Sequence, residues 1–336
     1  MVCKKPRTPI PLFTNNRLLM MKGIWLENQH LQFCPDLPVP EPAPNEALIR
    51  IVRAGICNTD LELVKGYYPY RGVPGHEFVG IVEKGPAEWL GKRIVGEINA
   101  ACGHCRFCVT HQPTHCENRT VLGIVNRNGA FADYTTLPVA NLHPVPDTVS
   151  TDTAVFTEPV AAALEIQQQV HITPSHRVLV VGDGKLGLLV AQTLALTGCE
   201  LVAAGRHPEK LAILKTQNIV TTPADTVDQR CFDLAVECTG NPAGFDIARR
   251  ALRARGTLVL KSTYAGELNI NASALVVDEI TVIGSRCGPF DHALAVLASS
   301  QIQVEPLIQG RYRLEQGIDA FNHARTRGTL KILFEN

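Results

Sequence analysis

The pattern of apolar and polar positions divides the chain into two parts with different periods. Residues 46–56, "EALIRIVRAGI", alternate with period two, which is typical of a strand buried on one face. Similar short runs, separated by glycine and proline turns, continue to about residue 150; they include "FVGIVEKG", "GKRIVGEI" and "GAFADYTTL". No long helical period interrupts these runs, so we predict that this part is mostly β-structure.

From residue 151 onward, helical and strand patterns alternate. A helix is predicted over 157–170, where a proline stands in the first turn, and another over 185–198, which ends at Gly198. A third helix is predicted over 208–217, and apolar runs predict strands over 176–182, 200–206, 231–240, 256–266 and 279–285. This alternation predicts an α/β fold with a doubly wound parallel sheet. The chain ends in "GTLKILFE", a predicted strand that we expect to return to the first domain.

Length and composition are those of an ordinary globular protein. The 336 residues suffice for about two domains. Apolar residues make up 45% and charged residues 19%, and the formal net charge is zero. No basic stripe indicates a nucleic-acid partner, and no apolar run is long enough to span a membrane.

Residues 1–20 carry four basic residues, no acidic residue and three prolines. We predict a flexible N-terminal extension, with an organelle-targeting segment as the alternative. The chain has eleven cysteines and no signal for export. This favours the cytoplasm, where clustered cysteines bind metal more often than they form disulfides.

A glycine-rich turn follows the predicted strand 176–182. Gly182, Gly184 and Gly187 have G-x-G-x-x-G spacing, and Lys185 and Leu186 lie between the last two glycines. After a strand and before a helix, this spacing predicts a turn whose backbone approaches the pyrophosphate of a dinucleotide. The free N–H groups of the helix would then bind the phosphates. Asp183 places a charge inside the turn, and we expect its side chain to point away from the phosphates.

The end of the next strand indicates which dinucleotide binds. An NAD-binding domain places an acid there, about 20 residues after the turn, to accept hydrogen bonds from the ribose hydroxyls. Here the position is Gly205, followed by Arg206 and, one helical turn later, Lys210. A small residue beside an arginine suits a 2′-phosphate, so the sequence favours NADP over NAD.

Four cysteines lie close together in "ACGHCRFCVTHQPTHC": Cys102, Cys105, Cys108 and Cys116. Four thiolates suit a closed tetrahedral zinc site that staples the loop. An iron–sulfur cluster and disulfides are the alternatives, although the run lacks the proline that follows the last cysteine of a compact cluster motif.

A second set of metal-binding residue types is dispersed along the chain. Cys57, His76, Glu77 and Glu158 offer one sulfur, one imidazole and two carboxylates. Such a mixed set suits an open, catalytic zinc site. Their spacing in the sequence does not by itself join them, because a lone cysteine or histidine is more often part of the core.

Taken together, "GICNTD", "GHEFVG", "CGHCRFC", "VVGDGKLG" and "ECTG" resemble the medium-chain dehydrogenase/reductase family in its zinc-dependent alcohol dehydrogenase branch. The resemblance covers residues 21–336. It implies a GroES-like β-rich catalytic domain over 21–150, a Rossmann domain over 151–287, and a return segment over 288–336 that completes the catalytic domain.

The resemblance also implies roles for individual residues. Cys57 and His76 match the catalytic zinc ligands, and Glu77 matches a glutamate that can approach or replace the zinc-bound water. Glu158 stands where plain alcohol dehydrogenases have cysteine, as in the polyol, glucose and threonine dehydrogenase branch. Asp60 matches an acid that orients the zinc-binding histidine, a role that coordination chemistry also predicts.

Further positions concern the proton relay and the cofactor. Thr59 matches the relay hydroxyl, but Glu62 stands where many relatives have the relay histidine, and Asn58 replaces a commoner glycine. Thr239 of "ECTG", Arg286 and Lys331 match positions that meet cofactor or substrate in some relatives.

The expected activity is hydride transfer between a secondary alcohol or ketone, polyol- or sugar-like, and a nicotinamide dinucleotide, with NADP favoured. Two zinc ions per chain are expected, one catalytic and one structural, in a homodimer or homotetramer. One alternative is a reductase of the same fold that acts on another carbonyl class. The other is a cofactor-binding paralogue with little catalysis.

Overall fold

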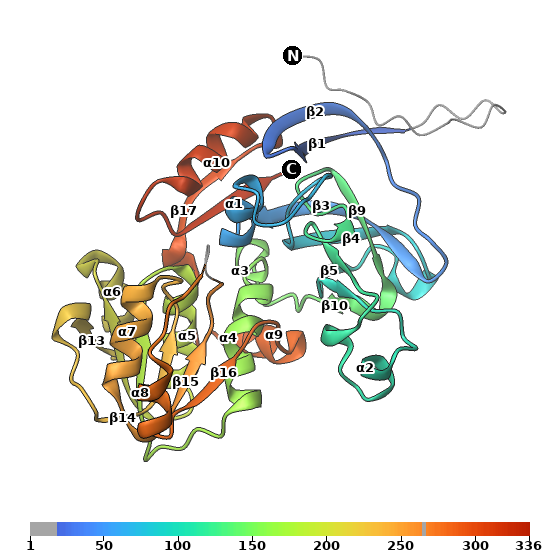
Figure 1. Cartoon of the computed structure of the whole chain (residues 1–336). Coiled ribbons are helices and arrows are strands. Elements are labelled where there is room, and N and C mark those ends of the chain that lie inside the picture. The colour runs from blue at the N-terminus through green and yellow to red at the C-terminus, as the bar shows by residue number, and fades with distance from the viewer. Residues whose placement is uncertain (1–18, 264–266) are drawn as a thin grey trace. The chain divides into compact units, whose positions relative to one another are not determined.

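The computed structural model describes residues 19–263 and 267–336, which form two compact units. The first comprises the described chain up to residue 145 together with 310–326 and 332–336, and the second comprises 146–309 and 327–331. Figure 1 marks the elements of both along the chain. Of the predicted extension 1–20, residues 1–18 lie outside the described residues.

The first unit is built on one large sheet whose assigned strand pairs are antiparallel. In spatial order its strands are β10 (Leu142–Pro144), β5 (Arg93–Gly96), β4 (Glu77–Lys84), β3 (Glu46–Gly55), β18 (Lys331–Glu335) and β17 (Ile308–Tyr312), with β9 (Tyr134–Pro138) also paired to β3. Leu333 of β18 lies opposite Gly55 of β3. The C-terminal strand therefore joins the N-terminal sheet, as its pattern predicts.

Smaller elements surround this sheet. They are the hairpin β1 (Met20–Glu27) and β2 (His30–Pro38), the sheet of β6 (Asn99–Ala100), β7 (Thr120–Leu122) and β8 (Asn126–Arg127), the helices α1 (Asn58–Val64), α2 (Arg106–Val109) and α10 (Gly317–Arg325), and the short turns η1 (Ala87–Trp89), η2 (Pro113–His115), η3 (Val139–Asn141) and η6 (Leu314–Gln316). Three aromatic rings join the end of the chain to the core: Phe131 lies 4.9 Å from Phe334 and 5.8 Å from Phe321, centroid to centroid.

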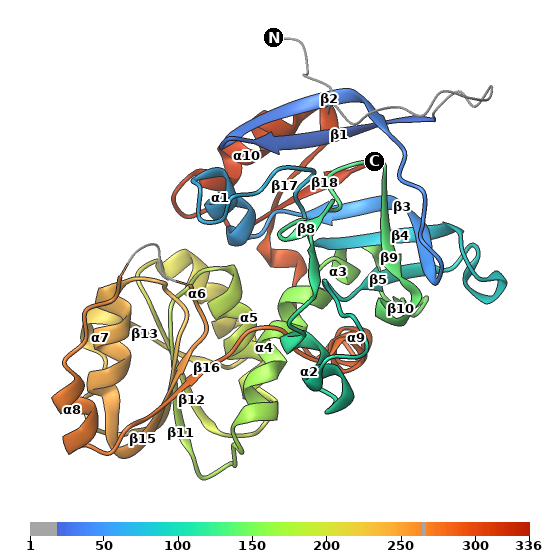
Figure 2. The same cartoon turned by 45° about the vertical axis from the view of Figure 1, so that its right-hand side comes forward.

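A parallel sheet forms the second unit, as the alternating pattern predicts. Its strands are, in spatial order, β13 (Val220–Pro223), β12 (Glu200–Gly205), β11 (Arg177–Val181), β14 (Phe232–Glu237), β15 (Leu252–Leu260) and β16 (Thr281–Gly284). The helices are α3 (Thr151–Ala154), α4 (Thr157–Gln169), α5 (Lys185–Ala195), α6 (Pro208–Lys215), α7 (Pro242–Ala251), α8 (Ala272–Val277) and α9 (Phe290–Ala298), with the turns η4 (Ala224–Thr226) and η5 (Glu305–Leu307). Figure 2 shows this sheet between α4 and α5 on one side and α7 and α8 on the other, which is a doubly wound arrangement.

Burial explains why the central strands of this sheet read as continuous apolar runs. Helices cover both faces, so successive side chains of β11 are all buried, from Val178 to Val181. Leu179 and Val181 pack in one cluster with Phe245 and Ala248 of α7. The carboxyl end of β11 thereby holds the glycine turn in a fixed position.

The second unit extends further along the chain than the sequence predicts. We expected the return segment to begin at residue 288, but residues 288–309 belong to the second unit, and the return begins at 310. The physical reason is α9, whose apolar residues Phe290, Ala293, Leu294 and Leu297 are buried and which packs against α4. Another boundary also differs: the strand predicted over 256–266 is β15, which begins at Leu252 and ends at Leu260, and residues 264–266 of that prediction lie outside the described residues.

Within the described residues, no helix combines the length and the apolar character that crossing a membrane would require.

Candidate metal centres and dinucleotide site

Cys57, His76 and Glu77 come together at the ends of two neighbouring strands. Cys57 follows β3, and His76 and Glu77 stand at the start of β4. Gly55 lies opposite Glu77 in the antiparallel pairing of these strands. As a result, one ligand atom of each of the three side chains lies within 4.8 Å of the other two. Strand pairing thus brings together residues that are about twenty positions apart in the sequence.

Asp60 fixes the positions of two of these residues. Its side chain is fully buried, and its Oδ2 accepts a hydrogen bond of 2.8 Å from the backbone N–H of Cys57. Its Oδ1 accepts one of 3.2 Å from the N–H of Gly75 and lies 3.3 Å from Nδ1 of His76. With Nδ1 beside a carboxylate, Nε2 is the ring nitrogen left for a metal, which is the usual arrangement of a zinc-binding histidine.

Gly75 explains why a glycine precedes His76. Its φ is +99°, a conformation that favours glycine. A Cβ at this position would also lie 2.5 Å from Cδ1 of Phe131. The turn that presents His76 therefore has no room for a side chain.

The electrostatics of this group favour a cation. Burial disfavours a charged imidazole, but the Asp60 carboxylate and the Cys57 sulfur outweigh it and raise the pKa of His76 well above its ordinary value. The same field would stabilise a metal cation. One sulfur, one imidazole and one carboxylate fit zinc, with one tetrahedral position left for a further ligand.

The remaining predicted catalytic residues lie around this group or in the second unit. Thr59 is half-buried on α1, and its Oγ1 lies 3.8 Å from Sγ of Cys57. Glu62 accepts a hydrogen bond of 2.7 Å from Nζ of Lys65, so its carboxylate is paired at the surface. Glu158 lies on α4 of the second unit, and its part in the metal site stays a prediction.

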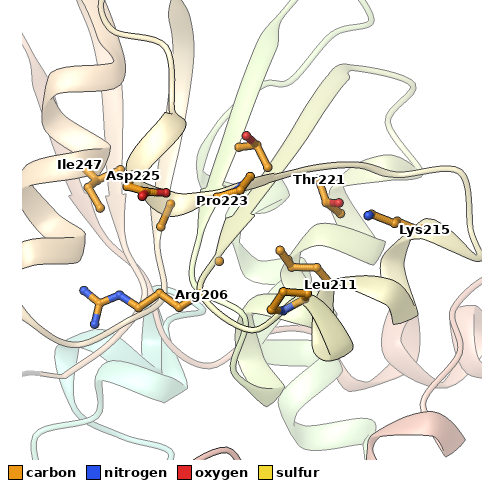
Figure 3. A pocket seen from close by; sticks show the side chains of 11 residues that line it. Arg206, Leu211, Lys215, Thr221, Pro223, Asp225 and Ile247 are labelled. Atoms are coloured by element: carbon orange, nitrogen blue, oxygen red, sulfur yellow. The ribbon is translucent and has the colours of Figure 1, made fainter.

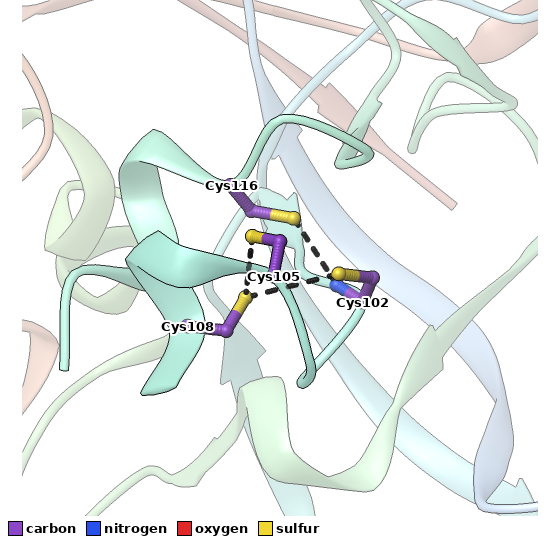
Figure 4. Close-up of side chains that lie close together, drawn as sticks. All are labelled: Cys102, Cys105, Cys108 and Cys116. Atoms are coloured by element: carbon purple, nitrogen blue, oxygen red, sulfur yellow. Dashed lines mark hydrogen bonds between the residues drawn. The ribbon is translucent and has the colours of Figure 1, made fainter. Parts of the chain in front are cut away.

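The four cysteines of the loop also converge (Figure 4). All four sulfurs lie within 4.8 Å of one another; the Sγ atoms of Cys105 and Cys108 are 3.5 Å apart and those of Cys102 and Cys108 are 4.0 Å apart. A tetrahedral zinc with Zn–S bonds of about 2.3 Å requires sulfurs roughly 3.8 Å apart. The loop therefore has the shape of a closed zinc site.

Backbone N–H groups prepare some of these thiols for a metal. The N–H of His104, followed by that of Cys105, lowers the pKa of Cys102 to about 6. The N–H of Cys108 contributes most to lowering the pKa of Cys105. Burial and the neighbouring thiols raise the pKa of Cys108 to about 12. Four thiolates at such distances repel one another, and a divalent cation removes that repulsion.

In the second unit, the glycine turn has the geometry that a pyrophosphate needs. Gly182 has φ +126°, and a Cβ on Gly187 would lie 2.0 Å from the carbonyl oxygen of Gly182, so helix and strand approach too closely for any side chain. By contrast, a Cβ built on Gly184 would have no described atom within 4 Å apart from those of its own neighbours in the chain. The turn is thus open at its second glycine, where α5 begins with Lys185 and Leu186. This geometry fits a dinucleotide phosphate at the helix N-terminus.

Beside the turn lies a cavity of about 440 Å³, which Figure 3 shows. Gly205 and Arg206 line it, as do Asp225 and Ile247. Lys210 lies buried on α6, and the lysine of that helix that lines the cavity is Lys215. The cavity lies beside the glycine turn and the end of β12, a place suited to the adenosine half of a dinucleotide.

The other predicted cofactor residues have local partners. The Thr239 N–H and hydroxyl both donate hydrogen bonds to Glu237 Oε1. Arg286 is exposed, and its carbonyl accepts a 2.7 Å hydrogen bond from Nζ of Lys261. Lys331 is 1% exposed, with Nζ 5.5 Å from the ring centroid of Phe156. Their contact with a cofactor stays a prediction.

Two structural features have weak signals in the sequence. The Asp183 side chain turns toward the end of β12, where it accepts a hydrogen bond from the N–H of Arg206 and lies 3.0 Å from Nδ1 of His207. Lys261 is 7% exposed, and burial lowers its pKa to about 8. A single acid in a glycine turn and a single lysine just after a strand have many possible environments, so only the fold reveals these.

Comparison with known proteins gives the family. Residues 43–147 match the alcohol dehydrogenase GroES-like domain, and residues 186–299 match the zinc-binding dehydrogenase domain. The chain is 32% identical over 246 residues to an L-threonine 3-dehydrogenase of Xanthomonas campestris pv. campestris, covering 67% of this chain and 69% of that protein. The chain belongs to the zinc-dependent alcohol dehydrogenase family of medium-chain dehydrogenases/reductases.

Two further members of the family resemble the chain over most of its length. A D-arabitol-phosphate dehydrogenase of Enterococcus avium is 26% identical over 327 residues, covering 90% of this chain and 93% of that protein. A putative zinc-binding dehydrogenase of Sinorhizobium meliloti 1021, solved bound to NADP, superposes with a TM-score of 0.85 at 26% identity, covering 95% of this chain and all of that one.

Family membership makes the chain a zinc-dependent oxidoreductase of alcohol dehydrogenase type that uses a nicotinamide dinucleotide. The GroES-like and Rossmann-type folds predicted from the sequence are confirmed. The cysteine loop and the Cys57 group both lie within the matched GroES-like region, and the helix that follows the glycine turn lies within the matched zinc-binding dehydrogenase region from Leu186 onward.

Proposed function

We propose that this zinc-dependent dehydrogenase interconverts a secondary alcohol and a ketone on a small polyol- or sugar-like substrate. The observation that carries the proposal is the convergence of Cys57, His76 and Glu77 on one point. Three donors of mixed chemistry suit a zinc that retains a position for substrate, whereas a structural site fills all four. A protein that only bound the cofactor would have no use for such an open site.

The chain's own residues would hold and serve the metal as follows. Cys57, His76 and Glu77 supply ligands, with Glu158 as a further candidate. Asp60 keeps the imidazole oriented through its contact with Nδ1. When bound, zinc supplies Lewis acidity toward the substrate oxygen and the nicotinamide accepts the hydride.

Thr59 is placed to move the substrate proton. Its hydroxyl lies 3.8 Å from the Cys57 sulfur, and a hydroxyl can accept one proton while donating its own. Glu62 lies on the same short helix, three residues after Thr59, and its half-buried carboxylate can take the proton onward only by releasing Lys65. The relay therefore depends on Thr59 in this proposal.

The substrate class is supported by Glu158 and by the names of relatives. A polyol phosphate and threonine both carry a secondary hydroxyl beside another polar group, and these are the substrates that name the two curated relatives. Simple primary alcohols lack this feature. Gly205 and Arg206 support NADP, as the sequence predicts, and the Asp183 carboxylate, which lies against Gly205, opposes a 2′-phosphate there.

A second zinc in the cysteine loop is part of the proposal. Its role is structural, since four sulfurs leave no position for substrate. We also propose a homodimer or homotetramer formed through β16, an edge strand of the parallel sheet. Val282 of β16 and Val276 and Val277 of the nearby α8 are exposed, which suits continuation of the sheet into a second copy.

A substrate panel tests the proposal. The zinc-loaded chain is assayed with polyols, polyol phosphates, threonine and primary alcohols, each with NAD and with NADP. We expect the highest kcat/KM with a polyol-type secondary alcohol. A clear preference for a primary alcohol or an aldehyde would support the reductase alternative, and no turnover with tight cofactor binding would support the paralogue with little catalysis.

A further inference from the structure

The Asp183 side chain occupies a defined place in the dinucleotide site. It is 10% exposed, and Oδ2 accepts hydrogen bonds from the backbone N–H groups of Arg206, at 2.5 Å, and His207, at 2.7 Å. Nδ1 of His207 lies 3.0 Å from Oδ1. The carboxylate of the glycine turn is therefore fixed against the end of β12.

This carboxylate fills the space that a side chain on Gly205 would need. A Cβ on Gly205 would lie 2.5 Å from Oδ2 of Asp183 and 2.6 Å from its Cβ. In an NAD-binding domain, an acid at the end of the second strand accepts hydrogen bonds from the ribose hydroxyls. Here that strand ends in glycine, and an acid from a different segment reaches the same place. The two positions exclude each other sterically, so one carboxylate can be present and not two.

The hydrogen bonds that Asp183 already accepts determine how many more it can accept from a ribose. An ionised carboxylate offers about four acceptor sites. Oδ2 uses two for backbone N–H groups, and Oδ1 uses one for His207, which leaves an acceptor on Oδ1 for a ribose hydroxyl. Burial would raise the pKa of Asp183, but the hydrogen bonds from His207 and Arg206 hold it below its ordinary value, so the group is ionised.

We propose that Asp183 is the specificity-determining carboxylate of the cofactor site and that it selects NAD over NADP. A 2′-hydroxyl can donate to Oδ1, whereas a 2′-phosphate brings negative charge against a fixed, largely buried anion. Asp183 also occupies the two backbone N–H groups that a phosphate would need. The proposal rests on the cofactor-binding role proposed above for this unit.

Arg206 and Lys215 supply positive charge in the same cavity, which would favour NADP. The Arg206 side chain is exposed, however, and an exposed cation is screened by water and salt more strongly than a buried pair. Figure 3 shows this side chain reaching along the cavity toward the side that carries Ile247. A planar guanidinium in that position is suited to the face of the adenine, opposite an apolar side chain.

Binding of NADH and NADPH to the zinc-loaded, full-length chain tests the proposal without any substrate. Dissociation constants are measured by nucleotide fluorescence. We expect wild type to bind NADH at least about tenfold more tightly than NADPH. In Asp183→Asn the ratio should fall by at least about tenfold, chiefly through tighter NADPH binding. Glu209→Gln, an exposed acid in the first turn of α6, is the matched control and should leave the ratio unchanged.

A second variant, in which the acid and the glycine exchange places, tests the proposal even if Asp183→Asn does not fold. In the double variant Asp183→Gly with Gly205→Asp, the acid returns to the end of the strand, and NADH preference should recover. Tighter binding of NADPH by wild type, or an unchanged ratio in a folded Asp183→Asn, would overturn the proposal. Failure of wild type to bind either dinucleotide would instead overturn the cofactor-binding role itself.

Discussion

Two glycines of the same turn are predicted to respond in opposite ways to the same substitution. Gly187→Ala places a Cβ 2.0 Å from the carbonyl oxygen of Gly182, which is backbone and cannot rotate away. Gly184→Ala places a Cβ where no described atom beyond its own neighbours in the chain lies within 4 Å, at φ −75°, which alanine adopts freely. The first change should destabilise the second unit, and the second should leave it folded and remove space from the pyrophosphate site.

The expected magnitudes follow from these contacts. Overpacking typically costs about 1–3 kcal/mol, and an overlap with backbone belongs at the upper end, about 3 kcal/mol. For a unit of this size, that lowers the melting temperature by about 6–12 °C. In Gly184→Ala, displacement of the pyrophosphate by a methyl group should lose at least one charge-assisted hydrogen bond, about 1.5–3 kcal/mol, and weaken dinucleotide binding by about 10- to 150-fold.

Thermal unfolding and NADH titration of both variants provide the assay. Each variant controls for the other, because the chemical change is identical and the positions are three residues apart. The reasoning is refuted if Gly184→Ala binds NADH as wild type does, or if Gly187→Ala melts at the wild-type temperature.

Three further predictions concern the metal centres and a buried lysine. Asp60→Asn should weaken zinc binding by the Cys57 group about 10- to 100-fold, since the imidazole and the Cys57 N–H lose their anionic partner; chelator competition measures this, and unchanged affinity would contradict it. Cys105→Ser should release the loop zinc and lower the melting temperature, and full zinc content by metal analysis would count against a four-sulfur site. Burial lowers the pKa of Lys261 from 10.5 to about 8, so the unfolded chain binds more protons between these values and stability rises with pH there. The melting temperature of wild type should therefore increase relative to Lys261→Met from about pH 8 to about pH 10, and a constant difference would argue against a neutral buried lysine.

The sequence predicts a helix or strand correctly where a single pattern of apolar positions continues over the whole element. The alternation in "EALIRIVRAGI" predicts β3, and the apolar run before Gly182 predicts β11, because burial on one face or on both leaves different patterns. The sequence does not predict the domain boundary, which lies after residue 309 and not at residue 288. α9 packs on α4, more than a hundred residues earlier, and such a tertiary contact leaves no local pattern.

The candidate sites divide in the same way. Cys102, Cys105, Cys108 and Cys116 lie on one loop, so their spacing alone predicts a metal site. Cys57 and His76 meet through strand pairing, and only the family resemblance joins them at the level of sequence. The role of Asp183 depends on the direction in which its side chain points, and sequence spacing does not specify that direction.

The central claim is that Cys57, His76 and Glu77 hold a catalytic zinc distinct from the zinc of the cysteine loop. The most direct test is zinc content measured together with turnover in Cys57→Ser, with Cys199→Ser, a half-buried cysteine of the second unit, as the control. We predict two zinc ions per chain in wild type and in the control, and one zinc, no turnover and intact NADH binding in Cys57→Ser. Two retained zinc ions, or wild-type turnover with one, would contradict the account.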